Sequence, residues 1–176
     1  MAAVVRIIGI DPGSRVTGYG IVDSDGRRHG YVDSGCIRVG SGALAERLRR
    51  IFDGVSELLA RFSPDESAIE RVFMNKNADS ALKLGQARGA AICALAGRGL
   101  AVQAYSPREI KQAVTGAGGA AKQQVQYMVT VMLRLERQPP TDAADALAVA
   151  LCHAHQREAR RKLALATGGG VAGPGG

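Results

Sequence analysis

Four carboxylates stand where a basic chain has little reason to place them. The 176 residues include 23 basic and 16 acidic side chains, which gives a formal net charge of +7. Asp11 and Glu70 each end an apolar run, and Asp142 and Asp145 open an Ala-rich helix. Carboxylates that converge inside a protein attractive to polyanions indicate a divalent-metal site that acts on a phosphodiester.

Each of these acids also has an ordinary explanation. Asp11 is followed by Pro-Gly, a sequence that often only forms a turn. Glu70 could pair with the neighbouring Arg71. Asp142 and Asp145 could simply complement the dipole at the start of a helix. Spacing does not show that the acids converge, so these alternatives stay open when each residue is considered alone.

Convergence would have definite chemical consequences. Carboxylates a few ångströms apart raise one another's pKa unless a cation compensates. Oxygen ligands suit Mg²⁺ or Mn²⁺ and disfavour zinc, and two such ions about 4 Å apart could activate water and stabilise a leaving 3′ oxygen. Asp142 and Asp145 are three apart and share a helix face. The Gly-rich stretch Ser14–Gly20 suits close backbone approach to a phosphate.

Hydrophobic periodicity predicts the elements that must position these residues. Short β-branched runs predict strands at Val4–Ile10, Val16–Asp23, His29–Val39, Ser67–Val72 and Leu100–Tyr105. Apolar residues at helical spacing, with their caps and breakers, predict five helices. These span Ala43–Phe62, Asn77 or Asp79 to about Ala96, Ser106 to the glycines at 116–119, Ala121–Leu135, and Thr141 to about Leu163. Ser106, Pro107 and Glu109 predict a capping box with proline at N1.

This order of elements predicts the fold class. An antiparallel three-strand meander, followed by helices that alternate with two more strands, is typical of an α/β domain with a ribonuclease-H-like mixed five-stranded sheet flanked by helices. We expect one folded domain over residues 1–157. The remainder, 158–176, is basic and then Gly-rich, and we expect it to be a disordered tail. Arg157–Lys162 supplies +3 of the net charge, so the domain itself is only mildly basic.

Composition also indicates where the protein works. Hydrophobic residues make up 46% of the chain, and none of its apolar runs reaches the roughly 18 residues that span a bilayer. The first residues lack the basic region and long apolar run of a signal peptide. The three cysteines are far apart and odd in number, which fits a reducing compartment. We therefore expect a cytoplasmic protein that does not associate with a membrane.

Three motifs resemble those of the RuvC family of Holliday-junction resolvases. They are Gly9–Gly20, Ile69–Met74 with its continuation to Gly89, and Asp142–Ala148. The resemblance covers the chain from about Val5 to His155. It implies that the metal-binding catalytic acids are Asp11, Glu70, Asp142 and Asp145.

The same resemblance implies contacts with DNA. Lys111 and Lys122 match basic residues that the family uses near the scissile phosphate or the DNA backbone. Phe73 matches an aromatic residue that stacks on bases at the junction, and the polar residues after it favour exposure. Without the resemblance, solvated lysines and a core phenylalanine would be the ordinary interpretations. The expected DNA-binding residues are Phe73, Lys76, Lys83, Arg88, Lys111 and Lys122.

The activity that the resemblance implies is cleavage of four-way DNA junctions. The enzyme would be an Mg²⁺-dependent endodeoxyribonuclease of recombination and repair, with two ions per active site and Mn²⁺ able to substitute. A junction is two-fold symmetric, so paired nicks favour a homodimer. The small residues Ala87, Gly89, Ala90 and Ala91 could pack against a second copy. The resemblance also implies cooperation with a branch-migration helicase complex of the RuvA–RuvB type.

Two other functions compete with this interpretation. Gly9–Ser14 also resembles the first phosphate loop of actin-like and sugar-kinase-like ATPases, but those proteins duplicate the fold and this chain has room for one unit. A junction-binding module with inert acids is the non-enzymatic alternative, and the presence of every motif acid disfavours it. His153 and His155 point to different sides of a helix and do not form a ligand pair.

Overall fold

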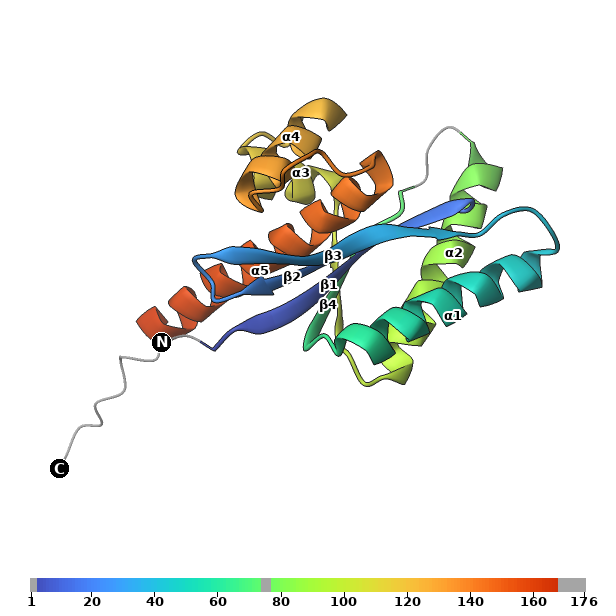
Figure 1. Ribbon diagram of the computed structural model, residues 1–176, viewed down its shortest axis with the longest axis horizontal. Coiled ribbons are helices and arrows are strands. Elements are labelled where there is room, and N and C mark those ends of the chain that lie inside the picture. Colours follow the sequence, from blue (N-terminus) through green and yellow to red (C-terminus); the bar gives the residue numbers. More distant parts are fainter. Residues whose placement is uncertain (1–2, 74–76, 168–176) are drawn as a thin grey trace.

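A mixed five-stranded sheet lies between two layers of helices (Figure 1). The computed structural model describes residues 3–73 and 77–167. The strand order is β3-β2-β1-β4-β5, antiparallel from β3 to β1 and parallel from β1 to β5. The strands are β1 (Val5–Asp11), β2 (Val16–Ser24), β3 (His29–Arg38), β4 (Glu66–Glu70) and β5 (Val102–Tyr105). The predicted fold class is therefore confirmed.

Each face of the sheet has its own apolar core. Ile8, Ile10 and Ile69 pack against α1 and α2 on one face. Ile7 and Val22 pack on the other face against α5, which α3 and α4 cover from outside. The helices are α1 (Leu44–Phe62), α2 (Ala78–Gly97), α3 (Pro107–Thr115), α4 (Lys122–Met132) and α5 (Thr141–Thr167). None of the helices in the described ranges is long and apolar enough to span a membrane.

Most predicted boundaries agree with the structure to within two residues. Two ends differ by more, since α4 is three residues shorter and α5 four residues longer than predicted. Strand β4 ends at Glu70 rather than Val72. Strand β5 begins at Val102, two residues after the predicted start, and α4 stops at Met132 because Arg134 adopts a left-handed backbone with φ of 53°.

Two glycines of the first motif bring α5 close to the sheet. A Cβ on Gly9 would lie 2.4 Å from the carbonyl oxygen of Ala146, and one on Gly18 would lie 2.1 Å from that of Asp142. Both distances are far below van der Waals contact, so only glycine fits. The expectation that the glycines of Ser14–Gly20 admit a phosphate is wrong for Gly18 and Gly20, because the open sides of both receive the backbone of α5, at Asp142 and Leu147.

The segment 158–167 is helical, so the expected disordered tail is wrong for these residues, whereas the helix predicted to about Leu163 is confirmed and extends further. It forms the last turns of α5, which continues to Thr167. Glu158 stabilises this end, since it pairs with Arg161 at 2.9 Å and Lys162 at 3.7 Å and lies against Gly26 of the β2–β3 hairpin. Periodicity could not reveal these pairs as a reason for the helix to continue. The expected disorder of 168–176 concerns positions outside the described residues.

The small residues of α2 divide between two environments. Ala87 and Ala91 are fully buried in the core beneath the helix. They are therefore unavailable to a second copy, contrary to expectation. The opposite face of α2 carries Gly85 and Gly89, where an added Cβ would meet open space, and Leu82, which is 62% exposed.

Candidate active site

The strand topology brings Asp11 and Glu70 together. Strands β1 and β4 are parallel neighbours, and Ile10 pairs with Ile69, so the next residue of each strand reaches the same edge of the sheet. The first turns of α5 lie at this edge because Gly18, which pairs with Asp11, lets the helix backbone approach. Asp145 is thereby carried to the two strand ends.

A hollow of about 270 Å³ lies among these carboxylates. Three acids and two lysines line it, the acids from two strands and α5, the lysines from α3 and α4. They are Asp11, Glu70, Asp145, Lys111 and Lys122. Its remaining walls are the apolar side chains of Pro107, Ile110, Val125 and Ala148. The predicted convergence is confirmed for three of the four acids.

Burial and mutual repulsion make Asp11 difficult to ionise. Burial raises the pKa of Asp11 to about 8, with further contributions from the charges of Glu70 and Asp145 and from a hydrogen bond to Glu70. Burial likewise raises the pKa of Glu70. The alternative partner of Glu70, Arg71, forms no ion pair with it among the described residues. Within the described residues, the protein thus leaves much of this negative charge uncompensated.

Lys122 provides part of the compensation. Its Nζ lies 2.9 Å from Oδ2 of Asp145, and that hydrogen bond raises the pKa of Lys122. The Asp145 side chain is only 18% exposed, whereas that of Lys122 is 64% exposed. A long, exposed side chain can keep its ammonium over the hollow or move it, while the carboxylates beneath are fixed by strands and a helix.

The donor set fits a hard divalent cation. All the acids offer oxygen ligands. The raised pKa of Asp11 indicates that its negative charge is poorly balanced, and a bound cation would balance it. Within residues 3–73 and 77–167, the protein does not gather three His, Cys, Asp or Glu side chains into a finished ligand set. The three acids at the hollow supply the right chemistry, and Lys122 holds one of them in an ion pair.

Asp142 occupies a different position from the other three acids. It is half-buried in the first turn of α5, and its side chain does not line the 270 Å³ hollow. Its backbone carbonyl packs on Gly18, one strand from Asp11, and its charge acts on Cys36 of β3 and on Lys122. It lies beside the site, toward the β2–β3 side of Asp11.

The expected DNA-binding residues differ in their surroundings. Lys111 and Lys122 lie in the hollow, as described above. Phe73 is 56% exposed, so its expected exposure is confirmed. Lys83 is exposed and pairs with Asp79 at 2.6 Å on the first turns of α2. Lys76 lies outside the described residues.

Arg88 does something that the sequence did not indicate. Its Nε donates to the backbone carbonyl of Glu70 at 3.1 Å, so it holds the end of β4 in place. Arg88 also lines an apolar hollow of about 890 Å³ along α2, together with Phe73. Sequence spacing gave no signal for this contact, since it joins residues 18 positions apart through the tertiary fold.

Local capping orients the helix that carries Lys111. Ser106 accepts from the backbone N–H of Glu109, and Glu109 accepts from that of Ser106, as the capping box predicts. His153 and His155 do separate: His153 bonds to Tyr105 and Glu66, whereas His155 donates to the carbonyl of Ala113. They form no ligand pair.

Comparisons with known proteins all find similarity to the same family of nucleases. Residues 7–153 match the family described as crossover junction endodeoxyribonuclease RuvC. The RuvC of Marinobacter nauticus is 59% identical over 165 residues, 94% of each chain, and that of Pseudoalteromonas atlantica is 62% identical over 152 residues, 86% of this chain and 88% of the relative. The Thermus thermophilus RuvC structure with a Holliday junction substrate aligns with a TM-score of 0.84 at 36% identity, covering 89% of this chain and 96% of that one. The yeast mitochondrial resolvase Ydc2, 12% identical over 93% of this chain and 84% of its own, shares the fold with a TM-score of 0.64.

Proposed function

The chain belongs to the RuvC family of crossover junction endodeoxyribonucleases, and on that premise we propose that it resolves four-way DNA junctions by paired symmetric nicks. It is a nuclease of DNA recombination and repair, not an ATPase of similar fold. One observation carries the proposal: three half-buried acids and two lysines line one hollow at the sheet edge. A basic chain that concentrates acids there is suited to bring metal and phosphodiester together.

The proposed catalytic and metal-binding residues are Asp11, Glu70, Asp142 and Asp145. The family depends on divalent metal, and we assign Mg²⁺, two ions per site, with Mn²⁺ able to substitute. Such ions supply an activated water and stabilise the leaving 3′ oxygen. The strands fix the backbones of Asp11 and Glu70, and the start of α5 fixes those of the two aspartates. Binding would then require the Asp142 side chain to turn into the hollow and Lys122 to release Asp145.

The proposed DNA contacts surround these acids. Lys111 and Lys122 present ammonium groups to the phosphate that enters the hollow, and they balance the negative charge that develops there. Phe73 is exposed beside an adjoining hollow that also reaches Asp11 and Glu70, a suitable position for stacking on an unpaired base. The remaining members of the proposed set are Lys76, Lys83 and Arg88. Because Arg88 also donates a hydrogen bond to the backbone carbonyl of Glu70, we propose that it helps to position this acid.

We further propose that the active form is a homodimer that pairs through the outer face of α2. Leu82, Gly85 and Gly89 are spaced at helical intervals on a face that the chain's own core leaves open. Two-fold symmetry would then set two active sites against a two-fold junction. We also propose that residues 1–157 are the nuclease unit, that the protein is cytoplasmic, and that it works with a branch-migration helicase complex of the RuvA–RuvB type.

A cleavage assay tests this proposal. Labelled four-way junction and linear duplex of the same sequence are incubated with protein and Mg²⁺, with EDTA, or with Asp11→Asn protein. Symmetric, ligatable nicks in the junction that need both metal and Asp11 are expected. Equal cutting of the linear duplex would indicate a general nuclease and contradict the proposal. Light scattering of the same protein should give the mass of a dimer.

A further inference from the structure

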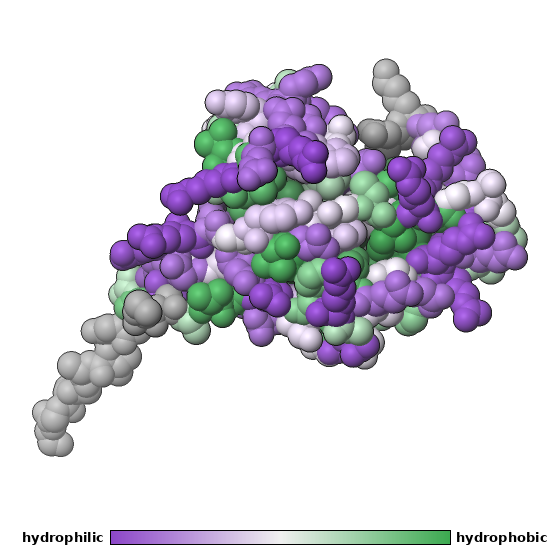
Figure 2. All heavy atoms as spheres, viewed as in Figure 1, coloured by the Kyte–Doolittle hydropathy of each residue, from purple (hydrophilic) through white to green (hydrophobic). Residues whose placement is uncertain are grey.

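A second hollow lies at the far end of α4 from the active site. It has a volume of about 770 Å³ and opens between the β2–β3 hairpin and the turn after α4. Three arginines line it, Arg27 and Arg28 from the hairpin and Arg134 from the turn, together with His29 and His155. It shares none of its residues with the catalytic hollow. Figure 2 shows hydrophilic side chains over α4 and beside the hairpin.

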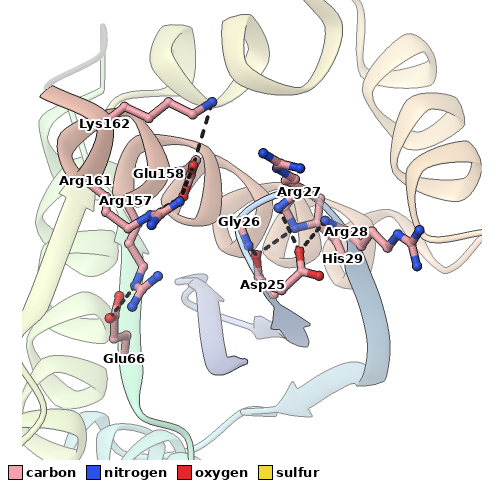
Figure 3. A network of polar contacts seen from close by, with 11 residues as sticks. Asp25, Gly26, Arg27, Arg28, His29, Glu66, Arg157, Glu158, Arg161 and Lys162 are labelled. Atoms are coloured by element: carbon pink, nitrogen blue, oxygen red, sulfur yellow. Dashed lines mark hydrogen bonds and ion pairs between the residues drawn. The ribbon is translucent and has the colours of Figure 1, made fainter. Parts of the chain in front are cut away.

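The three arginines have no acidic partner among the described residues: none of the hydrogen bonds or ion pairs found there uses their guanidinium groups. Two acids on the neighbouring elements have other partners. Asp25 accepts from the backbone N–H groups of Arg27 and Arg28 at 2.8 and 2.7 Å, and Glu158 pairs with residues of its own helix. In Figure 3 the side chains of Arg27 and Arg28 point away from both carboxylates.

The backbone conformation of Arg134 is an independent reason to assign a function to the three arginines. Helix α4 closes with hydrogen bonds from Arg134 to Val131 and from Leu135 to Thr130, a helix end that favours glycine at the left-handed position. Arg134 adopts that conformation with φ of 53°, at a cost of about 1 kcal/mol. A cation that merely complements the helix dipole could stand anywhere in the last turn. The strained position instead directs this arginine to the hollow.

The lengths of two helices give the distance between this hollow and the active site. Helix α4 runs from Lys122 at the catalytic hollow to Met132, 11 residues or about 16 Å. On α5, the ten residues from Asp145 to His155 span about 15 Å. At 3.4 Å per base pair along duplex DNA, the arginine hollow lies about four or five base pairs from the cleavage point.

We propose that Arg27, Arg28 and Arg134 bind the phosphodiester backbone of a junction arm, about four or five base pairs from the nick. The inference rests on the proposed function and adds a contact remote from the chemistry. Phosphate is favoured over an acidic protein segment because a duplex cut at the catalytic hollow would need to extend only about 15–16 Å along the protein to meet the arginines. Contacts of this kind add affinity that depends on salt and not on base sequence.

Arg134→Gly is a useful test variant because glycine removes the side chain and relieves the backbone strain. It is compared with the double variant Arg28→Ala/Arg134→Gly and with Arg98→Ala, which removes one exposed arginine at the end of α2. Binding to a four-way junction with long arms is measured by fluorescence anisotropy in EDTA over a salt series. We expect Kd to rise about 3- to 10-fold per contact and the salt slope to fall by about 1 for each arginine. Arg98→Ala should change neither.

Neutral methylphosphonate linkages locate the contact on the DNA. They are placed in all four arms, either at about four to six or at about 12 to 14 base pairs from the cleavage site mapped with wild-type protein, the nearer set matching the reach of the hollow. The near set should weaken wild-type binding and have little effect on the double variant. The far set should affect both proteins equally.

The outcomes separate this inference from the proposed function. Wild-type protein that cuts junctions normally, with Arg134→Gly and the double variant unchanged in Kd and salt slope, overturns the arginine site alone. That result would also be expected if the hollow bound an acidic protein segment. Wild-type protein without preference for junction over duplex overturns the proposed function first.

Discussion

Strand β4 carries a glutamate at each end, and the fold surrounds the two with opposite electrostatics. At its start, Glu66 receives Nε of Arg157 at 2.8 Å and lies 2.7 Å from Nε2 of His153. Burial alone would raise the pKa of Glu66, but the hydrogen bonds from Arg157 and His153 outweigh it and lower the pKa. At the other end, burial raises the pKa of Glu70 beside Asp11.

Strand β1 shows the same division. Near its start, Arg6 forms a two-bond ion pair with Asp23, at 2.8 and 2.9 Å. At its end, Asp11 has a pKa of about 8 because it is buried among other acids. One edge of the sheet thus pairs its charges internally and adds to stability. At the opposite edge, much of the negative charge of the acids lacks positive partners among the described residues, and only a cation from solution can supply them. Such an arrangement is expected of a site selected for function and not for stability.

Asp11→Asn should break this contrast most strongly. Cleavage of the junction should fall by about 10³-fold or more, because a buried metal ligand is lost. The fold should respond in the opposite sense. Between the ordinary pKa of 3.8 and about 8, folded Asp11 keeps a proton that the unfolded chain releases, so metal-free stability falls as pH rises through this window. At pH 8 the variant should therefore be more stable by roughly 2 kcal/mol or more.

Urea denaturation in EDTA at pH 8 measures that gain. Adding Mg²⁺ should stabilise the wild-type protein and have a smaller effect on Asp11→Asn. A variant less stable than wild type would mean that Asp11 is already compensated within the fold.

Lys122→Ala should give the next largest effect. The ammonium of Lys122 balances Asp145 and faces the hollow, so its removal should slow cleavage by about 10²-fold. Lys162→Ala is the matched control, since Lys162 is similarly exposed and pairs with Glu158 near the end of α5. Single-turnover cleavage at saturating protein compares the two. Equal cleavage rates for both variants would mean that Lys122 does not contribute to catalysis.

Much of the fold could be predicted because its signals are local. Apolar runs, the capping box at Ser106 and the turn residues each act within a few positions, and they gave the strands and helices with small errors. The prediction ended α5 near Leu163, four residues early, and gave no sign that Glu158 packs against Gly26 in a hairpin more than 130 residues earlier. Hydrophobic periodicity contains no information on such contacts.

The site shows a similar limit. Motifs indicated which acids matter, and parallel pairing of β1 with β4 explains why two of them meet. The motifs could not show that Gly18 serves the approach of α5, that Arg88 holds the carbonyl of Glu70, or that Asp142 lies outside the hollow. Each of these depends on the distance between elements, which the packing of side chains determines.

Glu66→Gln should sharpen the contrast from the stable end. Arg157 and the 3%-exposed His153 would lose their carboxylate, so the free energy of unfolding should fall by about 1–3 kcal/mol. Junction cleavage should stay close to wild type. Asp53→Asn provides the control, because it breaks an exposed pair with Arg49 on α1 and should cost at most about 0.5 kcal/mol. A cleavage defect in Glu66→Gln would show that the two edges are not independent.

Mild acid should produce the smallest effect, at His153. Burial lowers the pKa of His153 below its ordinary 6.5, despite the opposing influence of Glu66. As pH falls below 6.5, the unfolded chain binds a proton that the folded protein resists, so stability decreases. The Asp11→Asn background removes the opposite trend of Asp11. Between pH 6.5 and 5.5, Asp11→Asn protein should lose about 1 kcal/mol more than Asp11→Asn/His153→Gln protein. Glu66 contributes little in this range, since its lowered pKa acts below the ordinary 4.5. Equal losses of stability in the two proteins would mean that His153 binds its proton as readily in the folded as in the unfolded chain. The buried position of His153 would then accept an imidazolium charge.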